Sequence, residues 1–252
     1  MKLNSLDKSL QIVELLSKHP RGLSLSELTA KSGFPKSTIH HILSTFLPHE
    51  YIAQDPETKK YSLGFKFLNI SKSILDSIDI RKIAHDHLLE LHEKCGETVH
   101  LAILRNGKVV YIDKIDKTDN PGGLSLATYV GFYTDPHAAA GGKVILSELP
   151  MKKIMEIYQR ASLKKYGKNT ITRLDKLLNE LKQIRKDGYA IDDEEYYEGV
   201  RCVAAPIKAG GQVMGSVSIT GSIFTMTMER INGKLKKLVM KTAEMISSEM
   251  RW

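Results

Sequence analysis

The sequence is poor in cysteine and has no long apolar run, and both shortages limit its class. Only Cys95 and Cys202 occur in 252 residues, and two thiols cannot cross-link a small secreted fold, so we expect both to be reduced. No stretch approaches the roughly 18 apolar residues that cross a bilayer. Residues 1–18 carry scattered charges that the apolar core of a signal peptide lacks. We therefore expect a cytoplasmic protein with no membrane partner.

What is present is an ordinary globular composition with an unevenly distributed positive charge. Hydrophobic residues make up 42% and charged residues 26% of the chain, which excludes a disordered protein. The net charge of +8 indicates an anionic partner. However, residues 151–190 hold eleven basic and four acidic residues, whereas residues 1–62 hold eight and six. The net charge therefore supports nucleic-acid binding only weakly and does not locate the site.

Three short helices are predicted near the start of the chain. Residues 5–18 place leucine and valine side chains at helical spacing, so that one face of this helix is apolar. Ser24 and Glu27 form the capping-box pattern that opens a second helix over residues 25–32. A third helix is predicted over residues 36–46, after a tight turn.

A β-hairpin is predicted after the third helix. Its strands cover residues 51–54 and 59–63, on either side of a turn that contains Pro56. Three short helices followed by a hairpin, with a tight turn between the second and third helices, are typical of a winged helix-turn-helix. We therefore assign residues 1–63 to a DNA-binding domain and residues 64–78 to a linker helix.

Polar side chains gather on the third helix and beside the hairpin turn. Short hydroxyls and free backbone N–H groups at a helix N-terminus can bind phosphate. Residues 28–49 contain no carboxylate that would repel DNA. The lysines beside the hairpin turn are placed to reach an adjacent stretch of backbone. The residues predicted to contact DNA are Lys36, Ser37, Thr38, His40, His41, Lys59 and Lys60.

The remaining residues, 79–252, predict one α+β domain. Asn106 and Gly107 are a strong hairpin signal between two predicted strands, and Asp79 is placed to cap a helix. Irregular alternation of helices with antiparallel hairpins over about 170 residues fits a single core. Helices are predicted over residues 80–94, 143–149, 151–158, 174–186 and 228–250. Strands are predicted over residues 97–104, 108–115, 124–130, 202–209 and 213–220.

A series of short motifs runs along nearly the whole chain. They are Leu25-Ser26-Glu27-Leu28, Phe34-Pro35-Lys36-Ser37-Thr38, Gly96-Glu97-Thr98-Val99-His100, Tyr129-Val130-Gly131, His137-Ala138-Ala139-Ala140-Gly141-Gly142-Lys143, Gly188-Tyr189-Ala190, Asp192-Asp193-Glu194-Glu195 and Cys202-Val203-Ala204-Ala205-Pro206. In this order and spacing they resemble the IclR-type bacterial transcriptional regulators. The resemblance implies an α+β fold in which a linker helix joins the winged helix-turn-helix to a GAF-like effector domain. It also implies assembly into homodimers or tetramers.

The resemblance further implies where a small effector binds. In relatives that bind small carboxylates, the pocket uses a small-residue turn, an acid, a cysteine and two hydroxyls on one strand. These fall on Leu126 (as an apolar wall), Ala140, Gly141, Asp192, Cys202, Ser218 and Thr220. The chemistry agrees, because N–H groups at a helix N-terminus can hold a small anion. Hydroxyls two residues apart on a strand also face the same side.

Two other functions are compatible with parts of the sequence. Four histidines and a cysteine fall within sixteen residues, as a metal-sensing regulator would require, although no Cys-x-x-Cys and no i, i+4 histidine pair is present. These residues are His85, His87, His92, Cys95 and His100. Alternatively, Cys202 beside Arg201 could act as an enzyme's nucleophile, with His137 or His100 as its base.

We therefore predict a sequence-specific DNA-binding transcriptional regulator that has no cofactor and is not an enzyme. Paired recognition helices imply a pseudopalindromic operator in double-stranded DNA. We expect repression, and we expect operator binding to respond to a small carboxylate or sugar acid. At the middle of the third helix, His41 replaces the Arg common in relatives, which removes a bidentate guanidinium contact.

Overall fold

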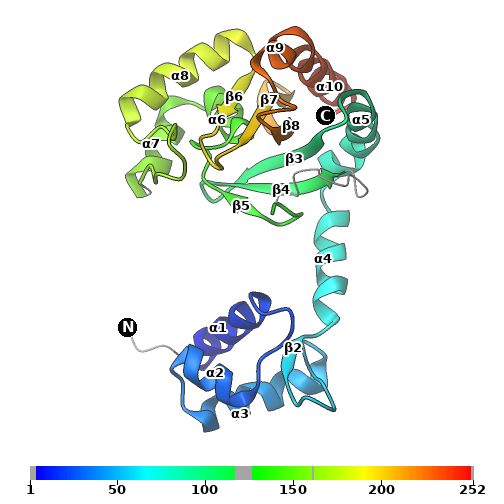
Figure 1. Cartoon of the computed structure of the whole chain (residues 1–252), viewed down its shortest axis with the longest axis vertical. Coiled ribbons are helices and arrows are strands. Elements are labelled where there is room, and N and C mark those ends of the chain that lie inside the picture. Colours follow the sequence, from blue (N-terminus) through cyan, green and yellow to red (C-terminus); the bar gives the residue numbers. More distant parts are fainter. Residues whose placement is uncertain (1–3, 117–126, 161, 251–252) are drawn as a thin grey trace. The chain divides into compact units, whose positions relative to one another are not determined.

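The computed structural model describes residues 4–116, 127–160 and 162–250, which belong to two compact units, Met1–Ser77 and Ile78–Trp252 (Figure 1). The boundary between the units falls at the end of the linker helix predicted from the sequence, so this helix belongs to the first unit. Within the described ranges, every helix is too short or too polar to cross a membrane.

The first unit contains helices α1 (Ser5–Ser17), α2 (Leu25–Ser32) and α3 (Lys36–Phe46), a short 3-10 turn (Leu47–His49), strands β1 (Ile52–Gln54) and β2 (Tyr61–Leu63), and helix α4 (Lys66–Asp76). The strands pair antiparallel, and an isolated bridge from Leu23 to Tyr61 attaches the segment before α2 to the hairpin. The order of helices and hairpin is that of a winged helix-turn-helix, as the sequence predicts.

Local signals define the helix ends of this unit. The Ser24 hydroxyl accepts a hydrogen bond from the Glu27 backbone N–H, and the Glu27 carboxylate accepts one from the Ser24 N–H, which confirms the capping box. Gly33 ends α2 with a φ of +70°, a conformation that suits glycine. The apolar faces of the helices meet around Ile12, Leu28 and Ile39, each fully buried.

The second unit is built on a six-stranded antiparallel sheet in the order β5-β4-β3-β8-β7-β6. Its strands are β3 (Thr98–Arg105), β4 (Lys108–Ile115), β5 (Tyr133–Thr134), β6 (Ala190–Asp193), β7 (Val200–Ala209) and β8 (Gln212–Ser222). Its helices are α5 (Asp79–Cys95), α6 (Ala140–Glu148), α7 (Met151–Arg160), α8 (Leu174–Asp187), α9 (Met228–Arg230), a π-helical turn (Ile231–Leu235) and α10 (Lys236–Glu249).

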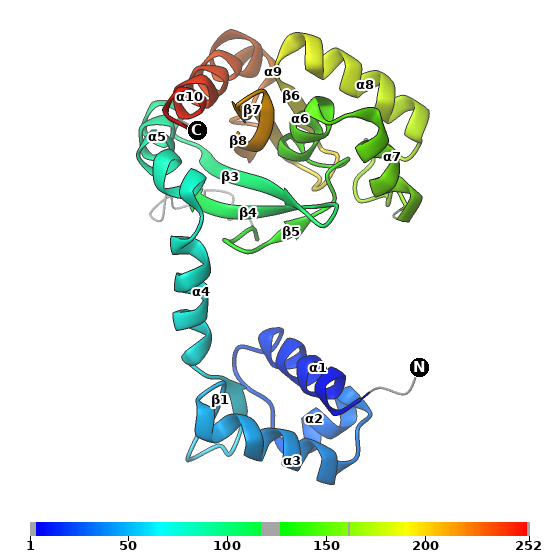
Figure 2. The same ribbon diagram turned by 180° about the vertical axis from the view of Figure 1, so that it is seen from behind.

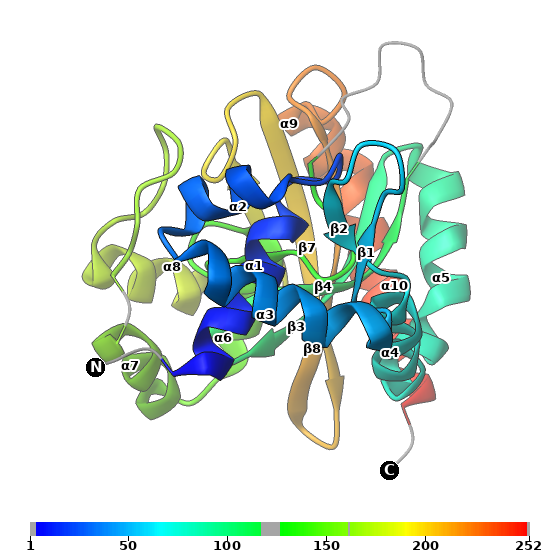
Figure 3. The same ribbon diagram turned by 90° about the horizontal axis from the view of Figure 1, so that it is seen from below.

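Helices cover both faces of this sheet. α5 and α10 lie side by side on one flank and α6, α7 and α8 on the other, which Figures 2 and 3 show from two directions. Successive residues of a strand face opposite sides. Because Val217 and Ile219 of β8 join the core beneath α5 and α10, Ser218 and Thr220 face the side of α6.

The structure corrects the predicted strand over residues 124–130. Within its described part, residues 127–130 contain no strand; instead, the Phe132 N–H donates to the Tyr129 carbonyl and closes a turn. The following Gly131 has a φ of +93° and donates its N–H to the Tyr111 carbonyl. The regular ladder with β4 is then limited to the two residues of β5 in the described part of this segment, because the turn occupies the residues before it.

Two further predictions differ from the structure, and one strand was not predicted. Asp79 does not cap a helix: it is the first residue of α5, Ile78 takes the cap position, and no side chain caps this end. Helix α6 begins at Ala140 rather than at residue 143, since two glycines fit the close packing there. Strand β6 was not predicted because its four residues are half acidic, and only pairing with β7 fixes their extended conformation.

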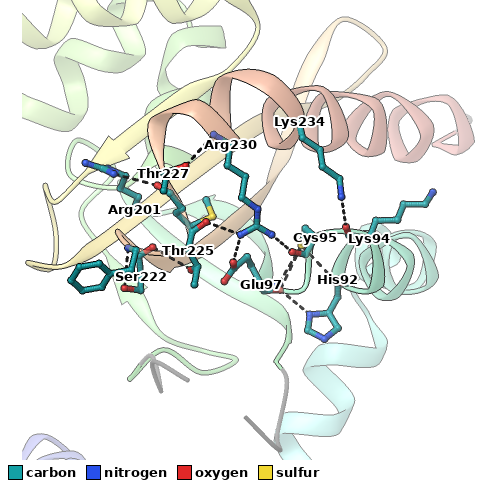
Figure 4. Close-up of polar contacts among 12 residues, drawn as sticks. His92, Lys94, Cys95, Glu97, Arg201, Ser222, Thr225, Thr227, Arg230 and Lys234 are labelled. Atoms are coloured by element: carbon teal, nitrogen blue, oxygen red, sulfur yellow. Dashed lines mark hydrogen bonds and ion pairs between the residues drawn. The ribbon is translucent and has the colours of Figure 1, made fainter. Parts of the chain in front are cut away.

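The Arg230 guanidinium connects the ends of several elements in this unit (Figure 4). It donates to the Glu97 carboxylate, to the Cys95 carbonyl at the end of α5 and to the Thr225 carbonyl, the last at 2.7 Å. A cation at a helix C-terminus also meets the negative end of the helix dipole. Arg230 therefore links α9 by hydrogen bonds to the segment between α5 and β3.

We expect Arg230→Ala to destabilise the protein by about 2 kcal/mol, because charge-assisted hydrogen bonds to part-buried partners are lost. Urea unfolding followed by circular dichroism measures this change. The matched control is Arg173→Ala, which removes an exposed ion pair with Asp175 and should cause little or no change. Equal midpoints for the two variants would contradict the assigned role of Arg230.

Candidate functional site

Helix α3 presents a polar, exposed face opposite its buried one. Ile39, Ile42 and Leu43 pack into the core of the first unit, so the intervening positions face outward. Among the predicted DNA contacts, Lys36, Ser37, His40 and His41 are exposed and Thr38 is half-buried. The structure therefore places these five side chains on the first half of one helix.

The beginning of α3 is open to an anion. Pro35 occupies the cap position, and no side chain accepts a hydrogen bond from the first turn. Backbone N–H groups at such an end have no partner within the helix and carry a partial positive charge. Lys36 adds a full positive charge at the same end. This arrangement can bind phosphate oxygens.

The hairpin supplies the predicted wing. The Asp55 carboxylate accepts hydrogen bonds from the Thr58 N–H at 2.6 Å and from the Thr58 hydroxyl at 2.8 Å. These bonds hold the Asp55 pKa below its usual value and fix the tip of the hairpin. Lys59 is exposed, with a φ of +56°, and Lys60 is half-buried. Lys59 is therefore the freer of the two to reach a neighbouring phosphate.

A cavity of about 30 Å³ lies in the second unit, on the side of the sheet that carries α6. We call it the ligand cavity. It has room for one or two water molecules as it stands. Its lining residues come from β3, β4, β5, β6, β7 and β8 and from the loops beside them: His100, Tyr111, Thr128, Phe132, Thr134, Ala139, Asp192, Tyr196, Tyr197, Val200, Cys202 and Thr220.

Three of the predicted effector-binding residues line the ligand cavity: Asp192, Cys202 and Thr220. β6 and β7 pair Asp192 with Cys202, and β7 and β8 pair Cys202 with Thr220, so the sheet register places the three in a row. Those of the other predicted residues that the structure describes do not line it. Ala140, Gly141 and Ser218 are buried, with Ala139 reaching the cavity instead, and Leu126 lies outside the described residues.

Sequence reasoning missed the aromatic part of the cavity wall. The rings of Tyr111 and Phe132 stack with centroids 6.0 Å apart, and the Tyr196 ring meets Phe132 edge-on at 6.4 Å. Tyr197 extends the same wall. These residues come from a strand and two loops that are distant in sequence, so no local pattern could have grouped them. His100, which also lines the cavity, does carry a signal in the sequence. It follows the buried Val99 in a predicted strand, so the two side chains face opposite sides of the sheet.

The polar residues around His100 form a continuous network. His100 Nε2 lies 2.9 Å from the Thr128 hydroxyl, and His100 Nδ1 lies 3.4 Å from the Thr220 hydroxyl. The Thr220 hydroxyl donates to the Cys202 sulfur at 3.2 Å. Burial, reinforced by the charge of Lys114, lowers the pKa of His100 to about 3. The imidazole is therefore neutral at physiological pH.

The two acidic groups of the cavity are also perturbed by burial. Burial, together with the neighbouring Asp192, raises the pKa of the Cys202 thiol to about 12. Burial and the negative charge of Glu195 raise the pKa of Asp192 to about 7. At neutral pH the thiol is protonated and only part of the Asp192 population is ionised. The partial negative charge of Asp192 is therefore the main charge of these cavity groups at neutral pH.

Helix α6 points its first turn toward this side of the sheet. No side chain caps it, and Ser216, which is 1% exposed, has a hydroxyl with no hydrogen-bond partner among the described residues. A Cβ added at Gly141 would lie 2.9 Å from that hydroxyl, and one at Gly142 would lie 2.4 Å from Pro136. Both glycines therefore let α6 approach the sheet closely, and Ala139, at the cap position of this helix, lines the ligand cavity.

The histidines and the cysteine that could form a metal site in a metal-sensing regulator contact different partners. His85 contacts Asp113 at 2.8 Å, His87 contacts Glu249 at 2.9 Å, and His92 contacts the Glu97 carbonyl at 2.8 Å. Cys95 is buried, and His100 belongs to the ligand cavity. Across residues 4–116, 127–160 and 162–250, no three histidine, cysteine or acidic side chains come together as metal ligands.

We expect native Cys202 to react slowly with iodoacetamide at pH 7.5, roughly a hundredfold or more slower than in the denatured chain, because only the thiolate is nucleophilic. Mass spectrometry of the peptides that contain Cys95 and Cys202 measures the two rates separately. Faster labelling of Cys202 in the native protein than in denaturant would instead indicate an activated nucleophile, as the enzyme alternative requires.

Comparison with known proteins places these features in a family. Residues 72–248 match "Bacterial transcriptional regulator IclR C-terminal" and residues 5–56 match "IclR helix-turn-helix domain". The HTH-type transcriptional regulator XynR of Escherichia coli is 37% identical over 81% of this chain and 80% of its own. The DNA-binding transcriptional repressor YiaJ of Escherichia coli is 32% identical over 98% of this chain and 87% of its own.

The fold agrees with these sequence similarities. The crystal structure of the Thermotoga maritima IclR superimposes with a TM-score of 0.84 and 32% identity, covering 99% of each chain. Both units therefore have counterparts in one solved protein, and both sequence patterns match along the chain. The chain belongs to the IclR family of bacterial transcriptional regulators.

Proposed function

We propose that this regulator is a repressor, that α3 and the hairpin contact its operator, and that the ligand cavity senses a small metabolite. The observation that carries the proposal is the carboxylate-free, uncapped beginning of α3, where Lys36, Ser37 and His40 are exposed together. Such an end both binds phosphate and can enter a major groove. The relative YiaJ, named as a repressor, supports repression over activation.

Operator contacts of this kind predict a steep dependence on salt, since each neutralised phosphate releases counterions. Lys36→Ala should reduce the slope of log K against log salt by about one unit. The measurement is fluorescence anisotropy with a duplex that the protein itself selects from a random library. Lys94→Ala is the control, because Lys94 pairs with Glu90 on the second unit, and its slope should equal that of the unchanged protein. A slope that Lys36→Ala leaves intact would refute this contact.

We propose a homo-oligomer that places two α3 helices on a pseudopalindromic site. α4 buries none of its residues; its Leu68 and Ile74 are more than half exposed, and so is Phe65, which precedes the helix. Exposed apolar side chains of this size favour a second copy of the same segment as their cover. Symmetric half-sites require such pairing.

The effector is proposed to be a small carboxylate or sugar acid. Its carboxylate would lie beside Ala139, at the beginning of α6, and the rest of the molecule would face the hydroxyl and aromatic lining. The cavity's small volume favours a compact ligand and requires the wall to move outward for a larger one. Binding would shift the balance between two arrangements of the protein, and coupling of about 1–3 kcal/mol changes operator affinity 5–150-fold.

Replacement of both strand hydroxyls, Ser218→Ala with Thr220→Val, should leave operator affinity within about twofold and abolish the response to ligand, because Thr220 lines the ligand cavity and Ser218 lies on the same face of β8 beside it. Glyoxylate, pyruvate and D-gluconate are suitable probes, screened first by thermal shift. Thr242→Val, which removes a similarly buried hydroxyl from α10, is the control and should retain the response. Joint loss of operator binding and ligand response in the double variant would mean that these hydroxyls are structural.

A carboxylate effector should bind more tightly as the pH falls through 7. Above its pKa of about 7, Asp192 is ionised and repels an anion, whereas below it the protonated acid can donate to one. Titration calorimetry of the bound probe between pH 6 and pH 9 should show affinity falling by up to about tenfold per pH unit above 7. Asp192→Asn should remove this dependence. Affinity that instead increases with pH would identify a neutral, hydroxyl-bearing ligand that donates to ionised Asp192.

A further inference from the structure

Lys143 of α6 carries a charge in the interior of the second unit. Its side chain is 0% exposed, and its ammonium donates to Glu180 of α8 at 2.5 Å, to the Ile191 carbonyl of β6 at 2.8 Å and to Glu195. These bonds use all three donors of the ammonium. Burial opposes the charge, but Glu195 and Glu180 outweigh it and raise the pKa of Lys143 above its usual value. Lys143 therefore stays positive.

Glu195 connects this charge to the ligand cavity. Its backbone N–H donates to the Asp192 carboxylate at 2.8 Å, and the next two residues, Tyr196 and Tyr197, line the cavity. One oxygen of Glu195 accepts from Lys143, and its other oxygen has no hydrogen-bond partner among the described residues. The Glu195 backbone thus connects the Lys143–Glu195 ion pair to Asp192 and to the turn that carries Tyr196 and Tyr197.

Four ionisable side chains face Asp192 from the surrounding elements: Lys143 of α6, Glu195 of the turn after β6, Cys202 of β7 and Tyr111 of β4. Burial raises the pKa values of the Cys202 thiol and the Tyr111 phenol, so both are neutral at physiological pH. Lys143 is positive, whereas burial raises the pKa of Glu195 although Lys143 opposes that rise; the two residues act on Asp192 in opposite directions.

We propose that Lys143 is a positioning residue for the ligand cavity. Through Glu195 it holds the turn that carries Tyr196 and Tyr197, and together with Glu195 it sets the charge that Asp192 presents to a ligand. The proposal rests on the ligand cavity being the effector site. It gives the buried Lys143–Glu195 ion pair, which lies outside the cavity, a role in that function: selection between anionic and neutral ligands.

The test measures Asp192 directly in the ligand-free, full-length protein. The carboxyl ¹³C resonance of Asp192, assigned by its loss in Asp192→Asn, is followed from pH 5 to pH 9. Glu195→Gln removes a negative charge and keeps the shape, so the titration midpoint should fall by about one pH unit. Adding Lys143→Met to this variant should raise the midpoint again, because a positive charge is then also lost.

Glu180→Gln is the matched control. It alters the other carboxylate that contacts Lys143. Glu180 and Glu195 each lie 2.5 Å from the Lys143 ammonium, but Glu180 is not among the groups that act on Asp192. Its midpoint should equal that of the unchanged protein. Midpoints that move together in all three variants, or in none, would overturn the proposal.

Folding and function are kept apart in this design. If the double variant fails to give a cooperative thermal transition, the comparison of Glu195→Gln with Glu180→Gln decides the proposal alone. Because the readout needs no ligand, failure to find an effector would count against the proposed function and leave the Asp192 result standing.

Discussion

The alternation of side chains along three adjacent antiparallel strands, β3, β8 and β7, is the constraint on which the second unit depends. One face of these strands is continuously apolar and is buried beneath α5 and α10. The period of two then forces every intervening residue to the other face. Thr220, Cys202 and His100 therefore meet across neighbouring strands, and the same register that closes the core also assembles the polar side of the ligand cavity.

Burial gives that polar side its chemistry. Neutral His100, protonated Cys202 and half-ionised Asp192 all follow from removal of charged groups from water, which favours their uncharged forms. In the sequence, Cys202 beside Arg201 can suggest a nucleophile, yet the buried environment opposes thiolate formation. The arrangement suits recognition of a small molecule, and the family to which the chain belongs consists of transcriptional regulators.

The two units use the positive end of a helix in different settings. α3 begins at the surface, with hydroxyls, lysine and histidines around uncapped N–H groups. α6 begins in the interior, where two glycines allow close packing and an unpartnered serine hydroxyl lies nearby. In the proposed function, the same backbone property would serve an extended polyanion at α3 and a small anion at α6. The difference in solvent exposure between the two helix ends separates these two roles.

The sequence by itself determined the elements whose signals are local. The capping box at Ser24, the left-handed caps at Gly33 and Gly188 and the hairpin at Asn106-Gly107 depend on neighbours a few residues apart. The same holds for the face of α3, where period and polarity agree. Tertiary structure alone decided the aromatic cavity wall, β6 and the buried charge of Lys143. The cavity wall and the Lys143 contacts join residues tens of positions apart, and β6 depends on pairing with a later strand. Burial, which no single segment encodes, sets the ionisation of the cavity groups.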